Sequence, residues 1–222
     1  MFDSWDLSLE SHESRDTVRE AFHRHFELSE SHVEYIINAL CALYNGREYH
    51  NLNHIAYVLE KASLYFERDG LIDNPEELDI AILFHDCIYT GSSKNDVFAS
   101  AHLAKCIAKG IGLSTNAIER IGKLILSTHS HIPYNNDSGI LCDCDMAILG
   151  DWNDYNIYAT NVKSEYISLG VSEKAYKIGR IAFLEKTIGK DIFHTERGKS
   201  TWEERAKMNM ERELLTLKTL DI

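Results

Sequence analysis

The chain has 222 residues, a length that suits one large domain or two small ones. Its hydrophobic fraction of 44% is enough for a substantial core, and no apolar run approaches the roughly 18 residues of a membrane span. The formal charge of -12 disfavours nonspecific binding to nucleic acid, which needs lysine and arginine to neutralise phosphates. We therefore expect a single domain over residues 1–222 with neither a nucleic-acid nor a membrane partner.

The N-terminus and the cysteines indicate the compartment. The stretch MFDSWDLSLESHES is acidic and lacks the basic start and apolar middle of a secretory signal. The five cysteines are an odd number and stand in apolar segments, which favours reduced core residues over disulfides. Cys142 and Cys144 resemble half of a thiolate zinc site, but the sequence has no second pair at zinc-ribbon spacing, so we expect them to pack in the core. A cytoplasmic location follows.

Helices are expected along the whole chain, because it has only two prolines and its glycines stand where apolar periodicity stops. The first covers about 15–28. The second starts near Ser31, which has capping-box spacing to Glu34, and stops at Gly46. The third contains REYHNLNHIAYVLEKA (47–62) and runs to Gly70.

The stretch DNPEELDIAILFHD predicts the fourth helix, in which Asn74 is the expected cap and Pro75 suits the first helical position. Further helices are predicted over 94–109, 115–129, 151–169, 172–188 and 201–219, with Ser114, Asp151, Ser172 and Thr201 as caps. We expect GKDIFHTERGKS before the last helix to be a polar surface loop. The pattern of GILCDCDMAILG leaves a short strand and a helical turn both open. The sequence therefore predicts an all-α bundle.

Histidines and aspartates stand on faces that should be buried. His50 and His54 are four residues apart at the expected start of the third helix, and His85 lies within the apolar face of the fourth. Asp86 follows it, in a helix that is apolar almost all round. A buried carboxylate without a partner costs several kcal/mol, so some group must compensate its charge.

Two later segments repeat this pattern. AIERIGKLILSTHSH ends in His129 and His131, and LCDCDMAIL places Asp143 and Asp145 among apolar residues. Taken singly, a histidine on an apolar face is usually a satisfied core residue, and a His-Asp dipeptide is common. Jointly, these segments favour a divalent cation, since imidazole and carboxylate are its usual ligands and two aspartates neutralise its charge.

The order of these motifs resembles that of the HD-domain superfamily of metal-dependent phosphohydrolases. The matching segments are YHNLNH (49–54), FHD (84–86) and the aspartate in DCDMAILG (143–150). The chain is similar throughout to a bacterial group of predicted HD phosphohydrolases with a YHN-x-x-H segment, an HD helix, a DxDLAILG-like segment and a C-terminal helix matched by ERAKMNMERELL. The YHN-x-x-H string also resembles the signature of class I cyclic nucleotide phosphodiesterases. The resemblance spans about 19–218 and implies a single HD-type helical bundle.

The resemblance also implies roles for particular residues. The implied metal ligands are His54, His85, Asp86 and Asp145. Asp145 is favoured over Asp143 as the last ligand, and the choice stays open. By analogy with the phosphodiesterases, His50 is the general acid, and Asp86 additionally orients the attacking water. His129 and His131 are candidates for a second metal or for substrate. Arg47, Lys94 and Arg180 are candidates for phosphate binding, with ordinary surface charge as the alternative.

The activity implied is metal-dependent hydrolysis of a small phosphate ester by a metal-activated water. Nucleotides, cyclic nucleotides and sugar phosphates all suit this chemistry, and Mn, Fe, Mg, Co, Ni or Zn all suit the ligands. Two other classes stay open: a diiron oxygenase, if the second histidine pair binds metal, and a non-catalytic metal- or ligand-binding HD module. The sequence leaves the oligomeric state open.

Overall fold

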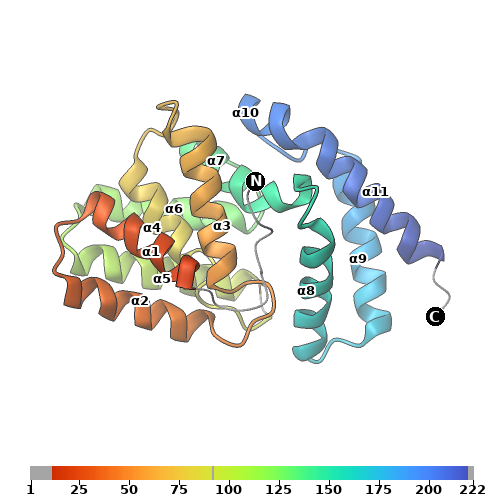
Figure 1. Ribbon diagram of the computed structural model, residues 1–222, viewed down its shortest axis with the longest axis horizontal. Helices are drawn as coiled ribbons and strands as arrows, with labels where there is room; N and C mark the ends of the chain where they lie inside the picture. Colours follow the sequence, from red (N-terminus) through yellow and green to blue (C-terminus); the bar gives the residue numbers. More distant parts are fainter. Residues whose placement is uncertain (1–11, 92, 220–222) are drawn as a thin grey trace.

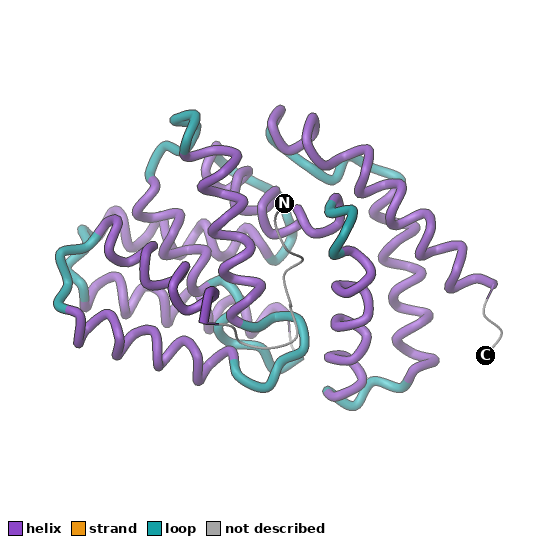
Figure 2. Tube along the Cα trace, viewed as in Figure 1, coloured by secondary structure: helices purple, strands orange, loops and turns teal. Residues whose placement is uncertain are grey.

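The chain is all-α in the computed structural model, which describes residues 12–91 and 93–219 and has no β-strand within them. Figure 2 shows helices joined by loops. The longer helices are α1 (His12–His25), α2 (Glu30–Tyr44), α3 (Leu52–Ala62), α4 (Pro75–Phe84), α5 (Ser93–Gly110), α6 (Thr115–Thr128), α7 (Asn136–Met146), α8 (Tyr155–Ser168), α9 (Glu173–Ile188) and α11 (Glu204–Thr219). Short helical turns are η1 (Ser63–Glu67), η2 (Ala147–Gly150), α10 (Glu196–Gly198) and η3 (Lys199–Glu203). The predicted fold class is confirmed.

Helices α1 to α7 pack together, and α8, α9 and α11 stand beside them (Figure 1). α3 and α4 are central, since every residue from Leu52 to Leu59 and from Glu77 to Phe84 is buried. Within the described residues, no helix combines the length and apolar character needed to cross a bilayer. The prediction that the N-terminal stretch is not a secretory signal rests mainly on residues 1–11, which lie outside the described residues.

α3 begins later than the sequence suggested. Asn51 is its N-cap, and the Asn51 side chain accepts hydrogen bonds from the backbone N–H groups of Asn53 and His54 at 2.9 and 3.4 Å. His50 therefore precedes the helix, and the expectation that His50 and His54 share one helical face is wrong. The capping asparagine instead holds His54 in the first turn and leaves His50 on the preceding loop.

Two other expected caps are not formed. Asn74 precedes α4 and Pro75 begins it as predicted, but the Asn74 side chain donates to Asp137 rather than capping the helix. The expected capping box at Ser31 is also absent, because the helix starts at Glu30 and Glu34 binds two arginines of α1, Arg15 and Arg19. Ser114 and Ser172 do cap α6 and α9. Thr201 is no cap, since it lies inside η3.

The ambiguous segment GILCDCDMAILG is helical. A capping box between Asn135 and Ser138 starts α7, which continues into η2. η2 ends at Gly150, where a Cβ atom would lie 2.9 Å from the backbone oxygen of Trp202. Asp151, the expected cap of α8, precedes that helix and accepts from the backbone N–H groups of Asn153 and Asp154, while α8 itself starts at Tyr155.

The segment before α11 is more buried than a polar surface loop. Ile192 and Phe193 are 5% and 0% exposed, and the helical turn α10 already starts at Glu196. Further on, Asn209 of α11 donates to the backbone oxygens of Leu149 and Asp151 at 2.9 and 3.1 Å. The C-terminal helix thus holds the chain that leaves η2.

None of the five cysteines, all of which the structure describes, forms a disulfide: Cys41, Cys87, Cys142 and Cys144 are buried, and Cys106 is exposed.

Candidate metal centre

Four side chains from three packed helices converge beneath one cavity. His54 lies in the first turn of α3, His85 at the C-terminal end of α4, and Asp145 in the last turn of α7. Asp86 follows His85. The two histidines are each 1% exposed, whereas the carboxyl side chains of Asp86 and Asp145 are 19% and 16% exposed. The histidine rings are therefore shielded from solvent, whereas the two carboxylates are partly accessible to it. We call the carboxylate side the open side of the group.

The spacing of these side chains suits one ion. Nε2 of His54 lies 3.2 Å from Oδ1 of Asp145, and Nε2 of His85 lies 3.3 Å from Oδ2 of Asp86. One ligand atom from each residue falls within 4.8 Å of all the others. Atoms bound to one ion at about 2.0 to 2.2 Å lie roughly 3 to 4 Å apart. The four residues can therefore hold a metal ion.

The buried histidine nitrogens support this fit. Nε2 of His54 and Nε2 of His85 are both buried without a hydrogen bond of acceptable geometry among the described residues. Nδ1 of His85 lies 2.9 Å from the carbonyl oxygen of Ile82, to which it donates. That bond leaves the lone pair of neutral His85 on Nε2, aimed at the carboxylates. A buried ring nitrogen without a partner is costly, and a cation would satisfy both rings at once.

The local charges call for a cation as well. Burial lowers the pKa of His54. Burial also opposes protonation of His85, but the charges of Asp86 and Asp145 outweigh it and raise its pKa well above the ordinary value. Conversely, although burial favours the neutral acid, the neighbouring histidines hold the pKa of Asp145 well below its usual range. Burial opposes ionisation of Asp86 too, but His85 lowers the pKa of that carboxyl as well. These shifts favour the ionised form of both carboxylates, which is the form that binds a metal.

His50 stands at the edge of this group on the loop before α3. Its Nε2 lies 4.0 Å from Oδ2 of Asp86, and its ring stacks on Tyr89 with the centroids 4.6 Å apart. Its Nδ1 bonds to Oε1 of Glu165, while Oε2 of Glu165 accepts from the backbone N–H groups of Tyr49 and His50 at 3.0 Å each. Glu165 therefore fixes both the ring and the backbone of His50.

The charges in this pair reinforce each other. Burial alone would lower the pKa of His50, but the hydrogen bond with Glu165 and the nearby carboxylates raise it. Burial would likewise raise the pKa of Glu165, yet His50 and the two backbone N–H groups lower it to about 2. His50 can therefore keep a proton on Nε2 while Glu165 stays ionised.

Glu165 belongs to the candidate site, although no motif in the sequence marks it. It lies in α8 and is 2% exposed, on the face that also buries Tyr155, Tyr158 and Val162. A glutamate in register with an apolar helical face was the available signal. Its partner, however, is more than a hundred residues away in the sequence, so no local pattern connects the two.

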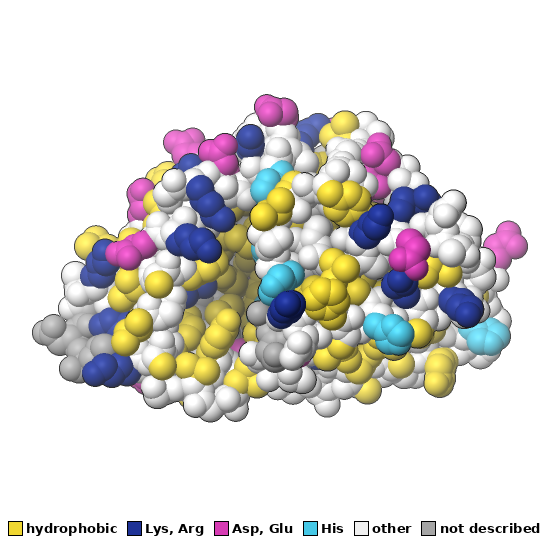
Figure 3. Space-filling model, turned by 180° about the vertical axis from the view of Figure 1, so that it is seen from behind, with side chains coloured by type: hydrophobic (Ala, Val, Ile, Leu, Met, Phe, Trp, Pro, Cys, Tyr) yellow, Lys and Arg dark blue, Asp and Glu magenta, His cyan; other side chains and the backbone are white. Residues whose placement is uncertain are grey.

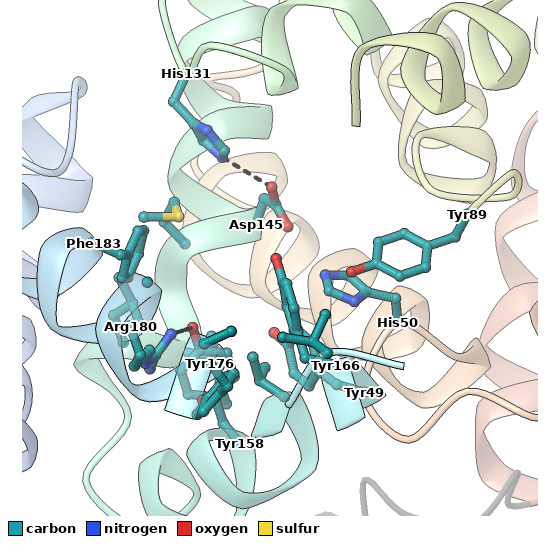
Figure 4. Close-up of a pocket in the computed structure, with 17 residues that line it drawn as sticks. Tyr49, His50, Tyr89, His131, Asp145, Tyr158, Tyr166, Tyr176, Arg180 and Phe183 are labelled. Atoms are coloured by element: carbon teal, nitrogen blue, oxygen red, sulfur yellow. Dashed lines mark hydrogen bonds and ion pairs between the residues drawn. The ribbon is translucent and has the colours of Figure 1, made fainter. Parts of the chain in front are cut away.

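Asp143 and the second histidine pair lie differently from the ligand group. Asp143 is fully buried and accepts from the backbone N–H groups of His194 and Thr195 at 2.7 and 2.9 Å. His129 is exposed and lies outside the ligand group. His131 has its Nε2 3.1 Å from Oδ2 of Asp145, on the open side (Figure 4). The structure thus brings Asp145 and His131, but neither Asp143 nor His129, to this place.

The three candidate phosphate-binding cations are engaged or remote. Arg47 donates to four backbone carbonyls, two of them those of His50 and Asp86 at 3.1 and 2.5 Å. Arg180 lies in the wall of the cavity, but its guanidinium binds both carboxylate oxygens of Glu213 at 2.9 Å. Lys94 is exposed near the start of α5 and does not line the cavity. Phosphate binding by these residues stays a prediction.

Comparisons of the chain with protein-family models, with curated proteins and with solved structures found no match. The described residues define a class all the same: an all-α protein with a buried group of histidines and aspartates that could hold a metal ion. This arrangement is compatible with the HD-domain family expected from the sequence.

Proposed function

We propose that this protein is a metal-dependent phosphohydrolase of the HD-domain type that cleaves a small phosphate ester. The observation that carries the proposal is the place of His50. Its Nε2 lies beside the metal-ligand group, and its Nδ1 is held by the buried carboxylate of Glu165. A proton-holding ring next to a metal site is what departure of an alkoxide from a phosphate requires.

The cation, Asp86 and His50 would each have a separate role in the reaction. When bound, the cation would lower the pKa of a water molecule towards neutrality and polarise the phosphoryl oxygens. Asp86 reaches the open side of the group, where its carboxylate can orient that water. His50 can pass the proton on its Nε2 to the leaving oxygen, because Glu165 holds the opposite nitrogen and favours the charged ring.

Elemental analysis of protein purified without added metal or chelator, followed by a panel of phosphate esters, tests the proposal. We expect about one Mn, Fe, Mg, Co, Ni or Zn per chain and hydrolysis of at least one nucleotide, cyclic nucleotide or sugar phosphate. Two irons per chain without hydrolysis would favour the diiron oxygenase. No metal even after reconstitution would favour the non-catalytic module.

His50→Ala is expected to keep the metal and to lower kcat by about 100- to 10,000-fold on esters of alkyl alcohols. The loss should be smallest for a p-nitrophenyl ester, whose leaving group departs without a proton. Metal content and kcat across a series of leaving groups check this prediction. If the variant loses metal in parallel with activity, His50 is a ligand and not an acid.

Glu165→Gln is expected to retain the metal and to lower kcat roughly 10- to 100-fold, because an amide cannot hold the charged ring of His50 as a carboxylate does. The same dependence on leaving group is the diagnostic readout, since a merely structural defect would lower all rates alike. Glu173→Gln, an exposed change on α9, is the matched control. Equal losses on p-nitrophenyl and alkyl esters would refute the positioning role.

A further inference from the structure

A cavity of about 520 Å³ extends from the metal-ligand group to α9. Its one end is formed by His50, Asp145 and His131, and its other by a face of α9 (Figure 4). The space-filling view shows a hollow with many apolar side chains along its walls (Figure 3). This volume lies within the range of sites for small organic ligands, so a substrate held by the metal would extend its organic part toward α9.

The walls of this cavity are largely aromatic and aliphatic. Besides Tyr89, which stacks on His50, five aromatic rings line it: those of Tyr49, Tyr158, Tyr166, Tyr176 and Phe183. They come from the loop before α3 and from α8 and α9, and Ile148, Leu149 and Val162 also line the cavity. Aromatic side chains bind planar rings by stacked and edge-on contacts, in addition to excluding water.

The described part of this wall has no lysine or arginine that is free to bind an anion. Among the described residues that line the cavity, Arg180 is the only lysine or arginine. It is 7% exposed, and its guanidinium is bound to Glu213 and to the hydroxyl of Tyr158. A second anionic group on the substrate would therefore be desolvated here without a counter-ion, at a cost of several kcal/mol.

One polar group in the wall is unsatisfied. The hydroxyl of Tyr176 is buried and has no hydrogen-bond partner among the described residues, and the residue as a whole is 8% exposed. Burial raises the pKa of Tyr176 to about 12, so the hydroxyl keeps its proton. Because this hydroxyl has almost no accessible surface, Tyr176 presents apolar surface to the cavity rather than a hydrogen-bond donor.

We propose that the alcohol part of the substrate is an uncharged group bearing an aromatic ring, which occupies this cavity between α8 and α9. The inference rests on the proposed function, because it places the phosphate at the metal-ligand group and the leaving alcohol toward α9. It excludes substrates with a second phosphate or a charged sugar acid beyond the scissile ester.

Gly179 provides the test. It lies in α9, lines the cavity, and a Cβ atom built on it meets nothing within 4 Å. A leucine side chain at this position would extend into the cavity without backbone strain. Leucine also favours a helix more than glycine does, by about 0.5 to 1 kcal/mol. Ala182→Leu adds comparable bulk to the same helix at an exposed position that does not line the cavity, so it is the matched control.

The experiment uses metal-loaded protein and two esters whose leaving alcohols are similarly weak acids, 2-naphthylmethyl phosphate and ethyl phosphate, each also as its methyl diester. We expect kcat/KM to be about 10- to 100-fold higher for the naphthylmethyl ester, because burial of its ring system in the cavity stabilises the bound transition state. Gly179→Leu should remove most of that preference and leave the rate on the ethyl ester within about twofold. Ala182→Leu should keep the preference.

Binding of 2-naphthylmethanol, measured by calorimetry, separates this proposal from the proposed function. Hydrolysis of both esters at equal rates, or an equal effect of Gly179→Leu on both, overturns the aromatic assignment and leaves the phosphohydrolase intact. If neither ester is hydrolysed, the phosphohydrolase proposal fails for this class, and the binding experiment decides about the cavity. Binding that Gly179→Leu abolishes supports an aromatic ligand, and no binding to the unaltered protein refutes it.

Discussion

Asp145→Ala is expected to abolish stoichiometric metal binding while the helical fold persists. Oδ1 of Asp145 lies 3.2 and 3.6 Å from the Nε2 atoms of His54 and His85, so one oxygen of this carboxylate lies near both rings. Its removal also takes away half of the negative charge that would balance a divalent cation. Loss of groups that merely orient ligands costs 10- to 100-fold in metal affinity, so loss of a ligand should cost at least about 100-fold. Elemental analysis and circular dichroism check the two parts of the prediction.

His129→Ala is the matched control for metal content. His129 follows α6, is exposed, and lies outside the ligand group, so its variant should bind metal as the unaltered protein does. Metal retained by Asp145→Ala at full stoichiometry would remove Asp145 from the ligand set. Metal lost from His129→Ala would instead require a second site that includes His129.

Asp143→Ala, only two residues away, is expected to destabilise the fold rather than the metal site. The change leaves the backbone N–H groups of the half-buried His194 and Thr195 without their acceptor and removes a 2.6 Å bond from the hydroxyl of Thr195. Each unsatisfied group costs about 1 to 3 kcal/mol. The desolvation that raises the pKa of Asp143 offsets part of this cost. The free energy of unfolding should therefore fall by roughly 2 to 4 kcal/mol. The folded fraction should still bind metal.

Thermal or denaturant unfolding measures this loss, which corresponds to a decrease in Tm of roughly 5 to 15 °C for a chain of this length. Asp191→Ala is the control, because Asp191 lies in the segment before α11 that also contains His194 and Thr195, and its side chain is 76% exposed. Its effect should stay within about 0.5 kcal/mol. Unchanged stability in Asp143→Ala, together with loss of metal, would show that the two aspartates have exchanged roles.

These two aspartates show where sequence reasoning ends. Residues two apart on a helix point about 200° away from each other, because each residue turns the helix by about 100°. Apolar neighbours surround both Asp143 and Asp145, so the local pattern cannot tell which of them faces α3. Only the packing of α7 decides, and it turns Asp145 to His54 and Asp143 to the segment before α11.

The helices themselves were largely predictable, since apolar periodicity and the caps Ser114 and Ser172 are local signals. Sequence reasoning failed where a side chain binds a residue that is distant in the sequence instead of a neighbouring backbone group. Glu34 has capping-box spacing to Ser31 but binds arginines of α1 instead. Arg180, a candidate for phosphate binding, has its guanidinium bound to Glu213, thirty-three residues later, a pairing that no local pattern indicates. A single sequence does not contain these pairings.

The four residues that could hold a metal ion stand at positions 54, 85, 86 and 145, and only the packed helices α3, α4 and α7 bring them together. An unfolded chain holds these side chains too far apart to chelate one ion, so a cation bound here binds the native state alone. Its binding free energy is then added to the free energy of unfolding. Each tenfold rise in free metal above the dissociation constant adds about 1.4 kcal/mol, which makes the concentration of available metal in the cell a determinant of how long the protein survives.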